Sequence, residues 1–180
     1  MKESPSYHES YQWITLFLFS VVAGVSQMLM LAFAPLIGWL QNEYGVTEAM
    51  ASLNLLLFPL LYVILSLYAG ALIDKRGYKY TVRLGAIFMA IGAFLRIFVN
   101  DFSMIILGSF IIAVGHPFVV NSITKLVCDG FANEELALAT GLASSGVLLG
   151  MIFGLLLTPL LVQNIGIAEY HDSFLNNNAC

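Results

Sequence analysis

The side chain best suited to proton or hydrogen-bond chemistry is a histidine inside a long uncharged stretch. His116 lies within the uncharged run Phe102–Thr124, between Gly115 and Pro117. Exposing an imidazole to lipid is costly, so the ring should face neighbouring helices or a water-filled cavity. There it could contact a solute or carry a proton. Alternatively it could line a kink, because Pro117 leaves the carbonyl of Ala113 without its helical donor.

A second polar group, the amide of Gln27, lies near the middle of the uncharged run Ser10–Asn42. An amide both donates and accepts hydrogen bonds, which suits an uncharged or zwitterionic ligand. The alternative is a hydrogen bond between helices, worth only about 0.6 kcal/mol in a membrane. Tyr62 and Asn121 also lie in uncharged stretches and are further candidates for an inward-facing, solute-contacting surface.

The composition places these groups in a membrane. Of the 180 residues, 59% are hydrophobic and only 10% are charged, and the mean hydropathy is +0.88. This balance excludes a water-soluble globule. The net charge of −4 leaves no basic face for nucleic acid, so the expected partner is the lipid bilayer.

Gaps between charged residues define the expected helices, because a bilayer core of about 30 Å requires about 20 helical residues without charge. They predict an all-α membrane protein whose five transmembrane helices span about 12–40, 49–73, 80–99, 102–126 and 136–162. Short connections indicate one compact bundle over 12–162. The odd helix count and the Asn-rich end, 176–178, suggest that 163–180 is a loop truncated before a sixth helix.

The charged residues also predict an orientation. Six basic residues fall on one side of the predicted bundle: Lys2, Lys75, Arg76, Lys79, Arg83 and Lys125. The opposite side carries only acids: Glu43, Glu48, Asp101, Glu169 and Asp172. The positive-inside rule therefore places residues 1–11 in the cytoplasm and 163–180 outside. Arg96, near the outer end of its helix, is expected to anchor at the membrane interface, with contact to a solute anion as the alternative.

Enzyme and metal chemistry find little support in the sequence. No Asp or Glu lies within a predicted helix span, which argues against a carboxylate proton relay. His8, His116 and His171 fall in different compartments and no Cys-x-x-Cys occurs, so neither a metal nor another cofactor is expected. The sequence also shows no nucleophilic residue at a spacing that would place it beside a general base. We therefore predict a protein that is not an enzyme.

The most specific motif is the turn between the second and third predicted helices, Gly70–Lys79. Gly70 would let a neighbouring helix approach closely, and Gly77 would supply the backbone conformation of a tight reversal. Asp74 can accept hydrogen bonds from amides at a helix start. Lys75 and Lys79 would anchor the turn among anionic headgroups.

This turn resembles the signature of the major facilitator superfamily, which matches here at Gly70, Leu72, Asp74, Lys75, Gly77 and Lys79. Tyr78 stands where a basic residue is usual. The resemblance implies that the chain is five helices of a six-helix half bundle, the N-terminal half of a secondary transporter. Gly70, Asp74, Lys75, Gly77 and Lys79 would then form its conformational-switch motif. The alternative is an ordinary tight membrane hairpin.

Two further features bear on that resemblance. The superfamily usually carries an arginine in its fourth helix, and none occurs within Phe102–Thr124, so a charge relay from Asp74 is unsupported. Gly146, Gly150 and Gly154 recur every four residues and share one helix face. By resemblance this face would meet the opposite half of the transporter, and the alternative is packing within this half.

A narrower resemblance is to the feline leukaemia virus subgroup C receptor-related group, carried by Phe33-Ala34-Pro35, Gly45-Val46, Arg96, Lys125 and Phe131. It implies a small organic solute, since choline or ethanolamine, and also haem, are associated with that group. Met30 and Leu148 stand where its choline carriers have tryptophan and glutamine. The loss of that tryptophan removes a cation–π contact worth roughly 0.5–2 kcal/mol.

Together these features predict transport of a small organic solute by alternating access at a cell membrane. The expected cavity residues are Gln27, Met30, Tyr62, His116 and Asn121. The expected partners are the bilayer, the solute and the missing C-terminal half of the same protein. The alternative is a receptor or assembly subunit that transports nothing.

Overall fold

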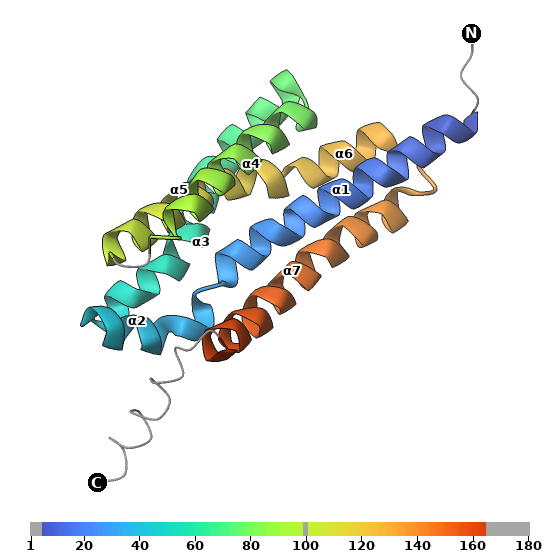
Figure 1. The fold of residues 1–180 in the computed structure, drawn as a ribbon. Coiled ribbons are helices and arrows are strands. Elements are labelled where there is room, and N and C mark those ends of the chain that lie inside the picture. Colours follow the sequence, from blue (N-terminus) through green and yellow to red (C-terminus); the bar gives the residue numbers. More distant parts are fainter. Residues whose placement is uncertain (1–4, 99–100, 165–180) are drawn as a thin grey trace.

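The computed structural model describes residues 5–98 and 101–164, and every regular element within these ranges is a helix (Figure 1). The long helices are α1 (Pro5–Leu31), α3 (Glu48–Arg76), α4 (Tyr78–Leu95), α5 (Phe102–Val120) and α7 (Leu136–Asn164). Shorter ones are η1 (Ala34–Leu36), α2 (Ile37–Tyr44) and α6 (Ser122–Gly130). The prediction of an all-α fold is therefore confirmed for the described residues.

Four stretches of the described residues are long and apolar enough to cross a bilayer: Tyr11–Tyr44, Glu48–Arg76, Phe102–Gly130 and Leu136–Leu161. The helix α4 is not among them. It has only 18 residues, and Lys79 and Arg83 lie in its first two turns, where they lower its hydrophobicity. The five-span count is therefore not established.

The predicted helix 12–40 is broken near its C-terminal end. The helix α1 ends at Leu31, and the chain passes through η1 before α2 begins. Pro35 explains the break, because it cannot donate a hydrogen bond to the carbonyl of Leu31. Gly45 then ends α2 with a positive φ of 61°, a conformation that favours glycine.

The predicted helix 102–126 is also divided. The helix α5 ends at Val120, one turn after Pro117, and α6 runs on to Gly130. Asp101 begins α5 by accepting a 2.9 Å hydrogen bond from the Ser103 amide. The side chain of Asn121 thus lies at the junction of two helices.

Glycines set the closest helix contacts. A Cβ atom added at Gly85 of α4 would lie 2.7 Å from the Gly115 carbonyl oxygen of α5, so these backbones almost touch. On α7, the same test at Gly146 meets Ser20 of α1 at 2.8 Å, and Gly150 meets Gly24. This close approach is what small residues permit in a membrane bundle.

The Gly146, Gly150 and Gly154 face therefore packs within this half of the bundle. The atoms nearest to these glycines belong to Ser20, Gly24, Met28 and Leu31, at the end and along the length of α1. This is the alternative that the glycine spacing left open, packing within this half. Contact of the same face with the opposite half stays a prediction.

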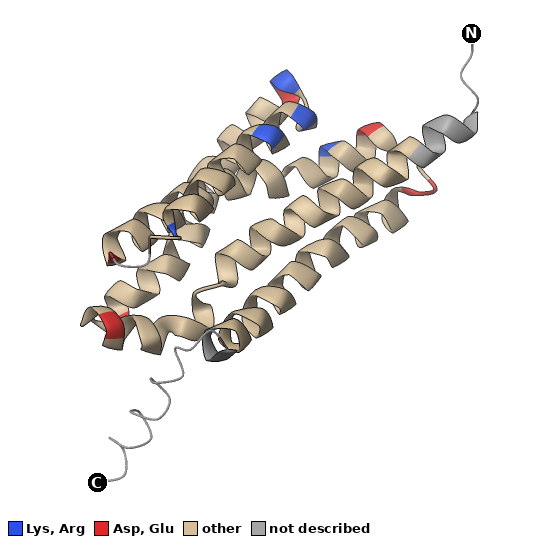
Figure 2. Cartoon of the chain, in the orientation of Figure 1, with Lys and Arg blue, Asp and Glu red and all other residues tan. Residues whose placement is uncertain are grey.

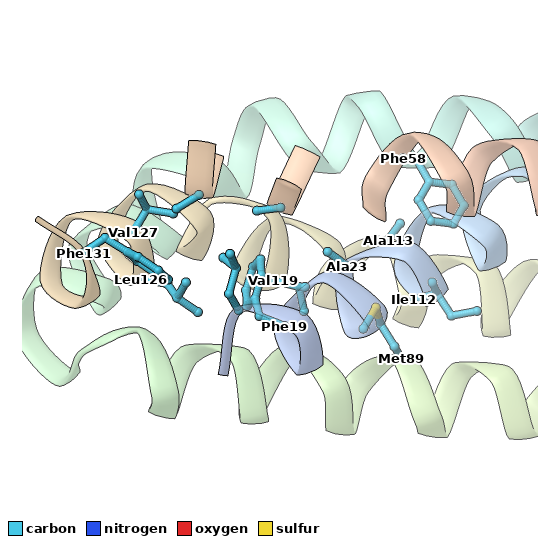
Figure 3. Packing of buried hydrophobic residues seen from close by; sticks show 13 residues of the cluster. Phe19, Ala23, Phe58, Met89, Ile112, Ala113, Val119, Leu126, Val127 and Phe131 are labelled. Atoms are coloured by element: carbon cyan, nitrogen blue, oxygen red, sulfur yellow. The ribbon is translucent and has the colours of Figure 1, made fainter. Parts of the chain in front are cut away.

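The buried core is built from residues of α1, α3, α4, α5, α6 and α7 (Figure 3). Phe19 and Ala23 come from α1, Met89 from α4, and Ile112 and Val119 from α5. Outward-facing residues are equally apolar, with Leu67 83% and Val63 71% exposed. A bundle that is apolar inside and outside is built for lipid.

Charges gather at the two ends of the bundle (Figure 2). One end carries the basic turn at Gly77 and the Lys125–Asp129 ion pair of 3.2 Å. The other end carries Glu43, Glu48 and Asp101. The helices between these ends are almost uncharged, as expected for elements that cross a bilayer.

Candidate functional site

A buried hydrogen bond joins α1 to α5 near the middle of the bundle. His116 is only 5% exposed, and its Nδ1 lies 2.7 Å from the Ser26 hydroxyl. The rings of Phe58 and Tyr62, both from α3, lie 6.0 Å from the imidazole. The imidazole therefore faces other helices rather than lipid, as the sequence predicted.

The polar contacts continue from Tyr62 toward the α5–α6 junction. The Tyr62 hydroxyl donates a 2.7 Å hydrogen bond to Oδ1 of Asn121. The Asn121 amide donates in turn to the Ser66 carbonyl, at 3.3 Å. Ser26, His116, Tyr62 and Asn121 are the four residues that we call the polar chain. Three of them were predicted to face inward from the sequence.

Gln27 and Met30 differ from the polar chain in their contacts. Gln27 is 7% exposed, and its Oε1 has no hydrogen-bond partner among the described residues. Leaving a buried acceptor unpaired costs about 1–3 kcal/mol, so this oxygen favours any ligand that brings a donor. Met30 is half-buried against the apolar core, and it contributes shape rather than polarity.

The sequence analysis missed one polar residue of the bundle interior, Ser26, and placed a second, Arg96, differently from the structure. Ser26 lies 90 residues from His116, and no local spacing could have paired them. Arg96 was expected at the membrane interface, but its side chain is 8% exposed and donates to Ser109 and to the Leu29 carbonyl. The expectation of an interface anchor is wrong for Arg96.

A separate apolar groove runs between α1 and α7. It encloses about 510 Å³ and is lined mainly by Phe17, Val21, Val25, Leu142, Leu149 and Phe153. None of the predicted cavity residues lines it. The groove therefore offers no polar group of the predicted site to a solute.

The basic turn has the conformation that its glycine predicted. Gly77 adopts a φ of 79° between α3 and α4, and its amide donates a 2.8 Å hydrogen bond to the Ile73 carbonyl. The Lys79 ammonium lies 5.7 Å from the centre of the Tyr11 ring, which ties the turn to α1 by a cation–π contact.

The rest of the turn is more open than expected. A Cβ atom added at Gly70 would meet nothing within 4 Å among the described residues. No described helix therefore approaches Gly70 closely, and its role in helix approach stays a prediction. Asp74 and Lys75 are exposed.

The described residues contain no group of three His, Cys, Asp or Glu side chains that could hold a metal ion.

Comparisons with known proteins agree with this architecture. The sequence profile of the Major Facilitator Superfamily matches residues 12–174. The chain is 26% identical over 156 residues to the feline (Felis catus) protein named choline/ethanolamine transporter FLVCR1, covering 85% of this chain and 28% of that protein. It is 30% identical to a solute carrier family 49 member 4 homolog of Xenopus tropicalis, covering 84% of this chain and 34% of the relative.

Another relative is the uncharacterized MFS-type transporter C09D4.1 of Caenorhabditis elegans, 24% identical over 92% of this chain and 28% of its own length. The chain thus spans about a third or less of the length of these relatives. Their names point to a transporter rather than an enzyme. With the profile match over most of its length, the chain is an integral membrane protein that belongs to the Major Facilitator Superfamily.

Proposed function

We propose that the chain forms the N-terminal half of a secondary transporter that moves a small organic solute by alternating access. The family match and the transporter names of the relatives support solute transport. The share of those relatives that the chain covers supports a second half elsewhere in the same protein. Alternating access requires two bundles that rock about a site near the membrane midplane.

In this proposal α4 is a fifth span, because it packs closely on α5 through Gly85 and Gly115. The half bundle then comprises residues 12–162. A sixth helix would follow the loop 163–180, which lies largely outside the described residues. Residues 1–11 lie in the cytoplasm in this proposal, as the basic turn at one end favours. The membrane that we propose is the plasma membrane.

The observation that carries the site is the polar chain, whose contacts join α1, α3 and α5 inside the bundle. His116, Tyr62 and Asn121 present ring nitrogen, hydroxyl and amide groups along one path. Gln27 adds an unpaired acceptor and Met30 an apolar wall. These groups carry no fixed charge, so they suit an uncharged or zwitterionic solute, or a small cation held by neutral acceptors.

The turn motif of Gly70, Asp74, Lys75, Gly77 and Lys79 acts as the conformational switch in this proposal. Gly77 fixes the reversal, and the exposed Asp74 and Lys75 are free to contact the second half as it moves. Gly70, which meets no described neighbour, leaves room for that half to approach.

The test is uptake by the purified full-length protein in proteoliposomes. The solute panel contains choline, ethanolamine and inorganic phosphate, because relatives carry names for choline/ethanolamine and for anion transport. We expect saturable uptake of an organic amine and none in protein-free liposomes. Residues 1–180 alone should transport nothing. Absence of uptake for every small solute would favour the alternative, a receptor or assembly subunit.

A further inference from the structure

Arg96 is a buried cation, and it lies toward the acidic end of the bundle. It follows the last residue of α4 and is 8% exposed. Its Nη1 donates a 2.6 Å hydrogen bond to the Leu29 carbonyl of α1. Its Nε and Nη2 donate to the Ser109 hydroxyl of α5 at 3.1 and 2.8 Å. One side chain therefore joins three helices.

The cluster extends to a fourth helix and contains no anion. The Ser109 hydroxyl lies 2.6 Å from Oδ1 of Asn54 on α3, to which it donates. The guanidinium also stacks near Phe33, 4.9 Å from the ring centre, and near Phe58 at 5.9 Å. None of the described acidic side chains forms an ion pair with Arg96. Among the described residues, neutral acceptors and aromatic faces stabilise its charge.

The contact with Leu29 has a specific physical meaning. Leu29 belongs to the last turn of α1, which ends at Leu31, and the carbonyls of a last turn lack donors within the helix. That turn is also the negative end of the helix dipole, which favours a cation. Arg96 thus supplies a donor to one carbonyl of this last turn, two residues before the Leu31 carbonyl that Pro35 leaves open.

This contact lies close to the polar chain. Ser26 precedes Leu29 by three residues, so fixing Leu29 also fixes the hydroxyl that meets His116. Phe58 contacts both sites. Its ring centre lies 5.9 Å from the Arg96 guanidinium and 6.0 Å from the centre of the His116 ring. A shift at Arg96 should therefore reach two of the neighbours of the imidazole, Ser26 and Phe58.

We infer that Arg96 is a positioning residue: it holds the broken end of α1 against α4 and α5, and thereby sets the Ser26–His116 contact. It does not itself touch the solute. The consequence for solute affinity rests on the proposed function, whereas the hold on α1 does not.

The test measures how open the end of α1 is in the full-length protein. An Ala34→Cys substitution places a thiol in η1, directly after the break, and the exposed native Cys128 serves as an internal reference. The protein is reconstituted in lipid nanodiscs, where both membrane faces are accessible. Maleimide labelling rates at the two positions are read by peptide mass spectrometry, without any solute.

We expect Arg96→Gln to raise the labelling rate at position 34 by about tenfold, the effect of losing one charged hydrogen bond, and to leave Cys128 unchanged. Arg96→Lys should restore part of the protection, because an ammonium can still reach the helix end. Ser109→Ala should give a smaller rise. The control Arg83→Gln changes an exposed arginine on the same helix and should alter neither rate.

Equal rates at position 34 in the parent, Arg96→Gln and Ser109→Ala proteins would overturn the inference. So would a rise of the same size at Cys128, because that result indicates general loosening rather than a local hold. If uptake by the parent protein fails while the labelling follows the expected pattern, the transport proposal falls and the role of Arg96 in holding α1 stands.

Discussion

At the scale of single residues, the bundle concentrates its few polar groups instead of scattering them. Ser26, His116, Tyr62 and Asn121 form the polar chain, and Arg96, Ser109 and Asn54 form a second cluster. Phe58 lies between the two. An unpaired polar group in the bilayer core raises the free energy of the folded protein. Hydrogen bonds between these side chains therefore allow them to remain inside the bundle.

The Tyr62 hydroxyl provides the simplest residue-scale prediction. Tyr62→Phe removes the donor to Asn121 and should lower the free energy of unfolding by about 0.6 kcal/mol, the mean for a hydrogen bond between membrane helices. If the polar chain binds the solute, KM for uptake should rise as well. Thermal unfolding and uptake kinetics of the full-length protein measure the two effects.

Tyr68→Phe is the matched control for that change. Tyr68 lies on the same helix and is 63% exposed, so its hydroxyl should matter little. If Tyr62→Phe leaves both stability and KM at the control values, the Tyr62–Asn121 hydrogen bond contributes neither to folding nor to solute binding.

The sequence could predict that Gln27, Tyr62, His116 and Asn121 face inward, because lipid excludes polar groups from the outer surface. It could not predict which of them meet. The Ser26–His116 and Tyr62–Asn121 contacts depend on how helices far apart in the chain cross, and no local spacing encodes a crossing. Arg96 was misjudged for a related reason: its acceptors lie on other helices.

At the scale of helices, proline alone does not predict where a span breaks. Pro59, Pro117 and Pro159 all lie inside helices that continue past them. Only at Pro35 does the helix stop, and there Arg96 supplies a donor to the last turn of α1. That donor lies 67 residues away in the sequence, so the local sequence does not reveal it.

The α1–α7 contact gives the prediction at this scale. Gly150→Ala places a methyl group against the Gly24 backbone of α1. Overpacking of this kind costs about 1–3 kcal/mol, so the unfolding temperature of the full-length protein should fall. The rigid backbone of a facing helix cannot move aside as a flexible side chain could.

Gly141→Ala on the same helix is the control, since a methyl group there meets nothing within 4 Å. It should change stability by no more than about 0.5 kcal/mol. Equal unfolding temperatures for the two variants would contradict the close packing of α1 on α7.

At the scale of the whole molecule, the uneven distribution of charge predicts how the protein sits in its membrane. The end with the Gly77 turn also carries Cys128, which is exposed beside the Lys125–Asp129 pair. We predict that this end is cytoplasmic, because short basic loops remain on that side.

Labelling with a membrane-impermeant maleimide tests that orientation in cells that express the full-length protein with Cys180→Ser and any cysteines of the second half replaced. Cys128 should react only after the cells are permeabilised. Labelling of Cys128 in intact cells would reverse the proposed orientation, and with it the side on which the basic turn works.

The measurement that tests the central claim most directly is solute uptake by the full-length protein with His116 changed. The account predicts that His116→Ala, at normal expression and unfolding temperature, lowers kcat/KM by about tenfold or more, as expected when a buried polar contact to the solute is lost. Ser26→Ala should shift uptake in the same direction. Wild-type rates in both variants, at every pH between about 5 and 8 where imidazole ordinarily titrates, would contradict a solute site at the polar chain.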